Sequence, residues 1–301
     1  NRMRNDREGG GYRTRHAGTD VLFCGDRAYV AVDLQTGPDG AVYLSDWYDV
    51  RHCHNPDAEQ WDRGNGRIYR MKFDASWRAV AVDLTKLSDV ELVGLQQHEN
   101  EWHVRGARQV LAERARVRAI DAEAVRQLRA LAVGGATDVL RLRGLWTLAQ
   151  SDGLDDSLLR QLLLDESEYV RAWAVQLGVE RQSGVVLGEL SRLAAGDVSL
   201  LVLRALASQV ARLDAAAAWS LAGALAARSE SDADEMLPSL LFFGIAGLLQ
   251  TDPVRGMQLS ETTVSQKLRD QIDWYLARTA QSGRERLLAG LRGVSMEEQR
   301  R

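Results

Sequence analysis

The residues best suited to chemistry gather in one polar stretch, residues 46–62. His52 and His54 flank Cys53, and this run combines soft and hard donors of the kind that bind transition metals. Residues two positions apart in an extended loop only share a side, and their spacing differs from the established zinc patterns. A metal site at His52, Cys53 and His54 is therefore one hypothesis, and a loop held by ordinary hydrogen bonds is the other.

Three further residues of this region are candidate ligand contacts. Asp46 directly follows a strand-like run, where its carboxylate could meet a ligand or could instead accept a backbone hydrogen bond that closes the strand. Asp49 belongs to the same polar stretch. Arg67 follows a Gly-Asn-Gly turn whose backbone N–H groups could face an anion, although a hairpin entry explains the turn equally well. The sequence has no Ser-His-Asp grouping and no GxSxG motif, so we predict no catalytic residue.

The elements that would hold these residues are short strands. Apolar residues alternate over residues 28–34, extended sequence continues at 42–44, and a third run covers 67–73. Pro38 and Asp39, flanked by glycines, predict a tight turn between the first two runs. Three strands of this kind fit one blade of an all-β array but cannot cover both of their faces. We expect them to complete a ring whose other strands precede Asn1.

From about Leu84 onward the pattern is helical and rich in Ala, Leu, Arg and Glu. Arginines separated by 38, 28 and 33 residues recur, each next to a small residue, at Arg105, Arg143, Arg171 and Arg204. Such spacing is typical of a two-helix repeat, whose apolar stripes are covered only by neighbouring repeats. We expect these arginines to be structural, reaching a turn carbonyl or an acidic side chain such as Asp165. Later helices are predicted at 215–228, 236–249, 264–280 and 284–291.

Composition limits the possible partners. Lys and Arg number 38 against 42 Asp and Glu, so the chain has no overall positive field for nucleic acid. Its longest nearly apolar run, residues 237–249, contains Pro238 and is shorter than the roughly 20 residues that span a bilayer. The polar residues after Asn1 lack the apolar segment of a signal peptide. We therefore expect the partners to be other proteins or neighbouring domains of the same chain, and we expect no nucleic acid and no membrane-spanning segment.

Several runs resemble a known family. GPDGAVYLSDWYD (residues 37–49) and CHNPDAEQWDRGNGRIYRM (53–71) resemble the end of the sorbosone/glucose-dehydrogenase-like β-propeller in the membrane-bound dehydrogenases of planctomycetes and their relatives. Downstream, ENEWHVRGARQVLAERA (99–115), LRGLWTLAQSDGLDD (142–156) and DESEYVRAWAVQLG (165–178) are similar to the linker and HEAT segments of that family. Its members typically continue into a c-type cytochrome domain.

The resemblance implies a mixed, mainly α fold: C-terminal propeller strands in residues 1–83 and a HEAT-type α-solenoid in 84–301. It implies a sugar or alcohol dehydrogenase-like protein of the periplasm or cell envelope, in which the solenoid is a scaffold between a redox propeller and a haem c domain. The alternative is a non-catalytic interaction or assembly module. CxxCH is absent from this sequence, so haem c would belong to a downstream domain; a quinone or calcium in the propeller stays open. In the periplasm, Cys24 and Cys53 could form a disulfide.

Overall fold

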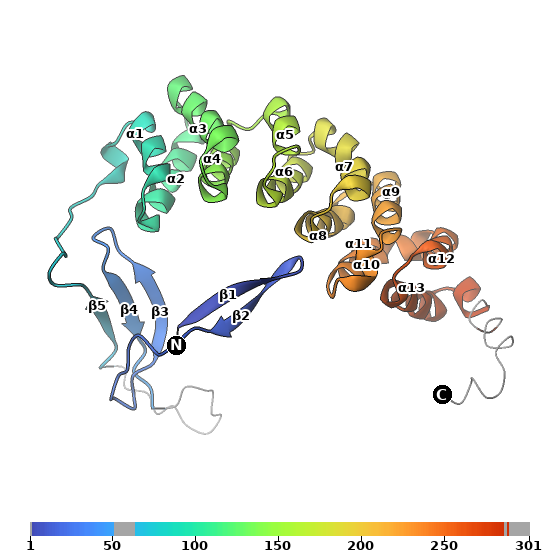
Figure 1. Ribbon diagram of the computed structural model, residues 1–301, viewed down its shortest axis with the longest axis horizontal. Helices are drawn as coiled ribbons and strands as arrows, with labels where there is room; N and C mark the ends of the chain where they lie inside the picture. Colours follow the sequence, from blue (N-terminus) through green and yellow to red (C-terminus); the bar gives the residue numbers. More distant parts are fainter. Residues whose placement is uncertain (1, 51–63, 286–287, 289–301) are drawn as a thin grey trace. The chain divides into compact units, whose positions relative to one another are not determined.

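The computed structural model describes residues 2–50, 64–285 and 288 and is mainly helical, with two small antiparallel sheets near the N-terminus (Figure 1). The chain forms two compact units. The described residues of Asn1–Arg4 and Thr14–Leu154 make up unit 1, and those of Asn5–Arg13 and Asp155–Arg301 make up unit 2. Among the described residues, no helix combines the length and the apolar character needed to cross a membrane.

The three-stranded sheet of unit 1 has the order β3-β4-β5, with β3 at Ala31–Thr36, β4 at Val42–Asp46 and β5 at Arg67–Met71. Both neighbours of β4 run antiparallel to it, and Leu34, Leu44 and Tyr69 lie side by side across the strands. The predicted turn joins β3 to β4: Asp39 accepts a hydrogen bond from the backbone N–H of Ala41 at 3.1 Å, and Gly40 has a φ of 74°. The positive φ explains the glycine.

The first predicted strand begins three residues late. Residues 28–30 were expected to be extended, but β3 begins at Ala31. Asp26 causes the difference, because its side chain accepts from the N–H of Ala28 at 2.9 Å and its carbonyl accepts from the N–H of Tyr29 at 3.4 Å. This local turn competes with the sheet for the backbone of these residues.

A hairpin that the sequence did not predict comes first in the chain, with β1 at Met3–Glu8 and β2 at Gly11–His16. Nearly every residue of both strands is exposed, so no apolar alternation marks them. Gly9, with a φ of 54°, lies in the turn. Hydrophobic alternation did not predict these two strands, because a hairpin with two polar faces has no period-two hydrophobic signal.

The helices of unit 1 pack as two pairs. A short η1 (Leu84–Lys86) leads into α1 (Asp89–Gly94), η2 (Leu95–Gln97), α2 (Glu101–Ala115), α3 (Ala122–Gly134) and α4 (Asp138–Gln150). Helix α1 packs on α2 and α3, and α4 packs on α2 and α3. Leu111, Leu128, Leu145 and Leu148 are fully buried between them. The β3–β4 turn meets the start of α2, where Asn100 donates to the carbonyl of Gly37 at 2.9 Å.

Unit 2 continues with helices in two rows. One row is α5 (Asp156–Leu162), α7 (Gly184–Gly196) and α9 (Ala215–Ala226), and the other is α6 (Glu168–Glu180), α8 (Leu200–Gln209), α11 (Leu237–Thr251) and α13 (Gln266–Thr279). Consecutive helices of each row pack on one another, and α5 to α9 and α11 also pack on helices of the other row (Figure 1). The remaining elements are η3 (Val210–Arg212), α10 (Glu230–Ala233) and α12 (Pro253–Thr262).

The later predicted helices correspond to α9, α11 and α13, whereas most of the predicted helix at 284–291 lies outside the described residues. Helix α12 was missed. It begins at Pro253, directly after Asp252, whose side chain accepts from the N–H of Arg255 at 3.0 Å. Proline is tolerated in a first helical turn, so Pro253 is compatible with the start of this helix.

Two glycine-to-alanine substitutions should have opposite effects. A Cβ at Gly144 of α4 would lie 2.7 Å from the backbone N of Ala132 in α3, so Gly144→Ala should lower the free energy of unfolding by about 2 kcal/mol. A Cβ at Gly188 of α7 meets no atom within 4 Å, and Gly188→Ala should raise it by up to about 1 kcal/mol because alanine favours the helix. Urea unfolding of both variants measures the two signs. Equal effects would mean that α3 and α4 can move apart freely.

Candidate functional site

Two of the candidate ligand residues are direct neighbours in the sheet. Asp46 on β4 lies opposite Arg67 on β5. Asp46 is only 6% exposed, and its Oδ1 accepts from the N–H groups of Val30 and Tyr48, both at 2.9 Å. Its Oδ2 is buried without a hydrogen-bond partner among the described residues. One carboxylate oxygen of Asp46 therefore holds the backbone at the strand end.

Arg67 is exposed and bonds locally. Its guanidinium donates to the carbonyl of Asn65 at 2.6 Å and to the side chain of Asn65 at 3.3 Å, and it lies 5.7 Å from the centre of the Tyr48 ring. These contacts stabilise the turn into β5. Asp49 is half-buried next to the end of the sheet and also has an interaction partner.

The residues of the metal-ligand hypothesis lie outside the part of the chain that the structure describes. His52, Cys53 and His54 belong to the undescribed segment 51–63, and so does one half of the predicted disulfide. Cys24, the other half, is exposed. Within residues 2–50, 64–285 and 288, no three His, Cys, Asp or Glu side chains come together as a metal site would require. Both hypotheses about segment 51–63 stay predictions.

Two of the four recurring arginines join consecutive helices of one row in unit 2. Arg171 of α6 donates to both carboxylate oxygens of Asp197 at 2.7 and 3.0 Å, and to the carbonyl of Asp165 at 2.8 Å. Arg204 of α8 donates to Asp234 at 3.0 and 3.1 Å. Asp197 lies just before α8, and Asp234 lies just before α11. Each arginine therefore reaches the start of the next helix in its row.

The other two arginines of the pattern behave differently. Arg143 of α4 is 8% exposed and points back along the chain, donating to the carbonyls of Gln96 at 2.9 Å and His98 at 3.2 Å and forming an ion pair with Glu101. The side chain of Arg105 is 81% exposed, and its nitrogen lies 4.0 Å from Glu101. The four arginines therefore lie on α2, α4, α6 and α8, but their side chains take different directions.

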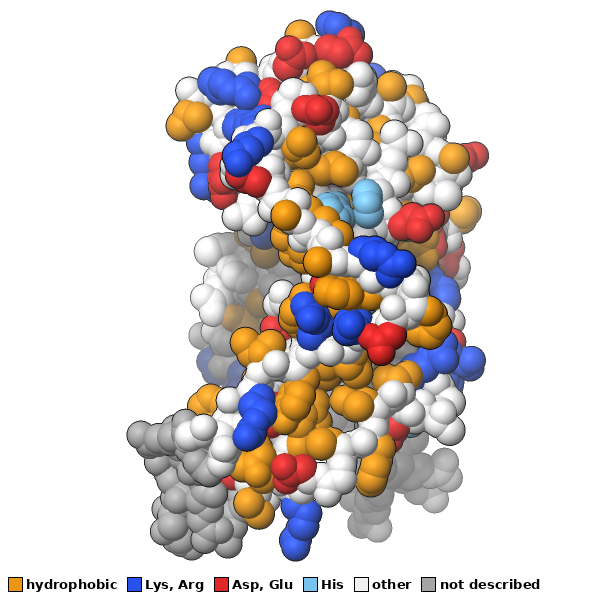
Figure 2. Space-filling model, turned by 90° about the vertical axis from the view of Figure 1, so that its left-hand side faces the viewer, with side chains coloured by type: hydrophobic (Ala, Val, Ile, Leu, Met, Phe, Trp, Pro, Cys, Tyr) orange, Lys and Arg blue, Asp and Glu red, His pale blue; other side chains and the backbone are white. Residues whose placement is uncertain are grey.

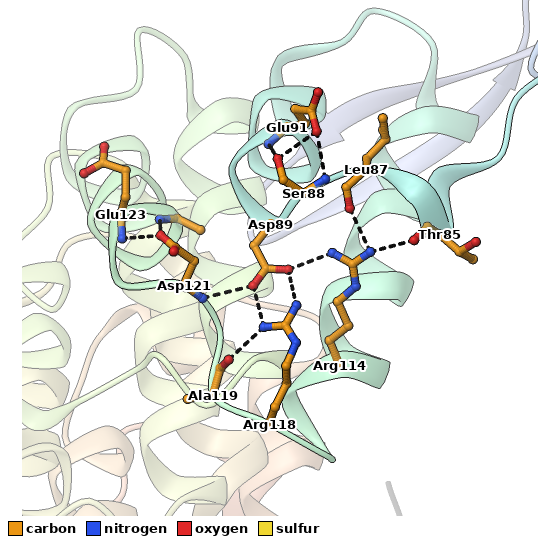
Figure 3. A network of polar contacts seen from close by, with 11 residues as sticks. Thr85, Leu87, Ser88, Asp89, Glu91, Arg114, Arg118, Ala119, Asp121 and Glu123 are labelled. Atoms are coloured by element: carbon orange, nitrogen blue, oxygen red, sulfur yellow. Dashed lines mark hydrogen bonds and ion pairs between the residues drawn. The ribbon is translucent and has the colours of Figure 1, made fainter.

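The densest polar network of unit 1 centres on Asp89, at the start of α1 (Figure 3). Its side chain, 2% exposed, accepts from Arg114 at 2.7 Å, from two nitrogens of Arg118 at 2.8 Å each and from the backbone N–H of Asp121 at 3.0 Å. Arg114 also donates to the carbonyls of Thr85 and Leu87. One carboxylate thus joins η1, α1, α2 and the start of α3.

This environment strongly lowers the pKa of Asp89. Hydrogen bonds from Arg118 contribute most, burial opposes them, and the N–H of Asp121 and the guanidinium of Arg114 add to the lowering. Because both carboxylate oxygens accept hydrogen bonds and the negative charge offsets part of the charge of the two arginines, the network stabilises the packing of these elements. The sequence carried one signal for it: Ser88 and Glu91 form a capping box, a pattern that marks the start of a helix.

The tip of the first hairpin packs on helices of unit 2. Arg7 lies 3.0 Å from Glu168 of α6 as an ion pair, and the hydroxyls of Tyr12 and Tyr169 share a hydrogen bond. Gly10 lies against Arg204, and a Cβ at that glycine would be 2.7 Å from the arginine Nε. The glycine therefore permits the close approach that places the tip beside α8.

The three-stranded sheet leaves apolar side chains uncovered among the described residues. Leu34 is 59% exposed and Ile68 is 77% exposed, and these two side chains point to opposite faces. The lower half of Figure 2 shows hydrophobic side chains gathered over this sheet, with charged side chains between them. Exposed apolar side chains on both faces are unusual for a sheet that stands alone.

Comparisons with known proteins add no relative. No protein-family model, no curated protein and no solved structure matches this chain.

Proposed function

We propose that this chain is a non-catalytic scaffold and interaction segment, a HEAT-type solenoid that follows the last strands of a β-propeller. The repeated contact from an arginine to the aspartate before the next helix supports this proposal most directly. Arg171 with Asp197, and Arg204 with Asp234, make the same link at neighbouring steps of one helix row. Repeat arrays re-use a contact in this way because each repeat packs mainly on its neighbours.

The exposed apolar faces of the three-stranded sheet support the propeller part. A blade in a propeller covers its faces with adjacent blades, so its strands keep apolar side chains on both sides. Ile68 and Leu34 have this character. We expect further strands of the same ring to cover them.

The redox context of the scaffold comes from the family resemblance. Under this hypothesis, the gene product oxidises a sugar or alcohol in its propeller. The solenoid separates the propeller from a haem c domain in the periplasm or cell envelope. The solenoid also offers a surface for protein partners. The alternative removes the electron transfer and keeps an assembly module of the same folds.

Visible spectroscopy distinguishes the electron-transfer hypothesis from the assembly-module hypothesis. The gene product that carries this chain should show a haem Soret band that shifts when a suitable sugar is added. Absence of the band would remove the electron-transfer reading and leave the assembly module. The 301-residue chain alone is expected to oxidise none of the same sugars, and turnover by this chain would contradict a scaffold role.

A further inference from the structure

A basic pocket of unit 1 lies along α2 beside the end of α4. Its volume is about 420 Å³, and its lining includes Arg105, Arg108 and Arg116. These positions are three and eight residues apart, which places them along one side of the helix. The lining carboxylate, Glu113, accepts a hydrogen bond from Gln109 at 2.9 Å. Three arginines thus line this pocket together with one carboxylate-bearing residue.

A second acidic side chain close to Arg105 is already shared between two arginines. Glu101 forms an ion pair with Arg143 and lies 4.0 Å from Arg105. Burial lowers the pKa of Arg108, Glu101 opposes that effect, and the charges of Arg143 and Arg105 lower the pKa further. Two carboxylates, Glu101 and Glu113, therefore stand among the four guanidinium groups of Arg105, Arg108, Arg116 and Arg143, and a net positive charge remains beside the pocket.

The hydrogen-bonding capacity of Arg108 is also largely unused. Its guanidinium carries five N–H donors, yet its one hydrogen bond within the described residues is a 3.5 Å contact to Oε1 of Gln96, which already accepts from Thr147 at 3.1 Å. The buried Nε has no acceptor among the described residues. The ring of Trp146, 5.3 Å away, covers one side of the guanidinium and offers no acceptor.

The network around Asp89 contains a buried acceptor shared by two arginines, and the pocket lacks such an acceptor among the described residues. Arg114 and Arg118, on the same stretch of chain, both donate to one buried carboxylate, which offsets part of their positive charge. The pocket of Arg105, Arg108 and Arg116 has no equivalent acceptor in the described residues.

We propose that this pocket binds a multiply charged oxyanion, either a phosphate group or the several carboxylates of a small polycarboxylate ligand. Its oxygens would accept hydrogen bonds from Arg108 and from the exposed side chains of Arg105 and Arg116, with Gln150 at the edge. Guanidinium groups pair with phosphate and carboxylate through several parallel hydrogen bonds, which suits this lining.

Calorimetric titration of the 301-residue chain with inorganic phosphate tests the proposal, at an ionic strength held constant with sodium chloride. A parallel titration with citrate distinguishes the two sources of oxyanion. We expect saturable binding of at least one of them. The double variant Arg105→Gln/Arg116→Gln should weaken that binding at least about tenfold, because each exposed guanidinium supplies charge-assisted hydrogen bonds.

The matched control is Arg126→Gln/Arg192→Gln, which removes the same charge from two arginines outside the pocket that are 67% and 58% exposed. It should bind as the unmodified chain does. No saturable binding of phosphate or citrate would overturn the proposal. Equal weakening in both double variants would also overturn it, since the loss of two positive charges anywhere on the chain would then explain the weaker binding.

Discussion

Asp89→Asn should lower the free energy of unfolding by about 4 kcal/mol. The substitution keeps the size of the side chain but removes the charge that pairs with Arg114 and Arg118 at 2.7 and 2.8 Å. Breaking a buried ion pair by neutralising one partner typically costs about 3–5 kcal/mol, because the remaining charge loses its compensation. Urea unfolding followed by circular dichroism measures the loss, and hydrogen exchange should locate it in α1, α2 and α3.

The stability that Asp89 contributes should depend on pH, and it should decrease as the pH is lowered. The pKa of Asp89 is lowered in the folded chain by Arg118 above all, so the unfolded chain binds this proton more readily. The stabilisation is therefore complete above the unfolded pKa of about 3.9 and is lost as the pH falls further toward the folded pKa. The difference between the native chain and Asp89→Asn should be constant from pH 7 to 5 and shrink below about pH 4.

Asp138→Asn provides the matched control within the same unit. Asp138 pairs with Arg141 at 2.8 Å, but its side chain is 44% exposed, so its loss should cost at most about 1 kcal/mol. If both variants lost the same stability, the network around Asp89 would be no more than an ordinary surface pair.

The sequence predicted the elements wherever hydrophobic periodicity was strong. Strands β4 and β5 begin at Val42 and Arg67, where their predicted runs begin, because a tight turn and a buried Leu44 fix the register. The hairpin of β1 and β2 gave no such signal, because its residues are exposed on both faces. Local periodicity reports burial, so it cannot reveal an element that buries little.

The contacts of the site were harder to predict than its elements. Asp89 could be read as the start of a helix, but its partners Arg114 and Arg118 follow 25 and 29 residues later and meet it only through tertiary packing. The same holds for Arg143, which turns back to Glu101. Spacing identifies the face of a helix, whereas a long arginine side chain can reach acceptors in several directions.

Arg171→Ala should lower the free energy of unfolding by about 3 kcal/mol. Asp197, whose side chain is 5% exposed, would keep its charge but lose both bonds from the guanidinium, and the carbonyls of Asp165 and Glu166 would lose a donor. Hydrogen bonding to Asp197 contributes most to raising the pKa of Arg171, so the pair stays ionised at neutral pH. Thermal and urea unfolding measure the loss.

Two further variants show whether the loss comes from the link between α6 and α8. Arg192→Ala removes an arginine that is 58% exposed and paired only along its own helix with Glu189, so it should cost less than about 1 kcal/mol. The double variant Arg171→Ala/Asp197→Asn should lose clearly less than the sum of its two single variants, because the second substitution removes the uncompensated charge. Strict additivity would mean that Arg171 and Asp197 act independently, and the repeated arginine contact would then lose its role in joining neighbouring helices.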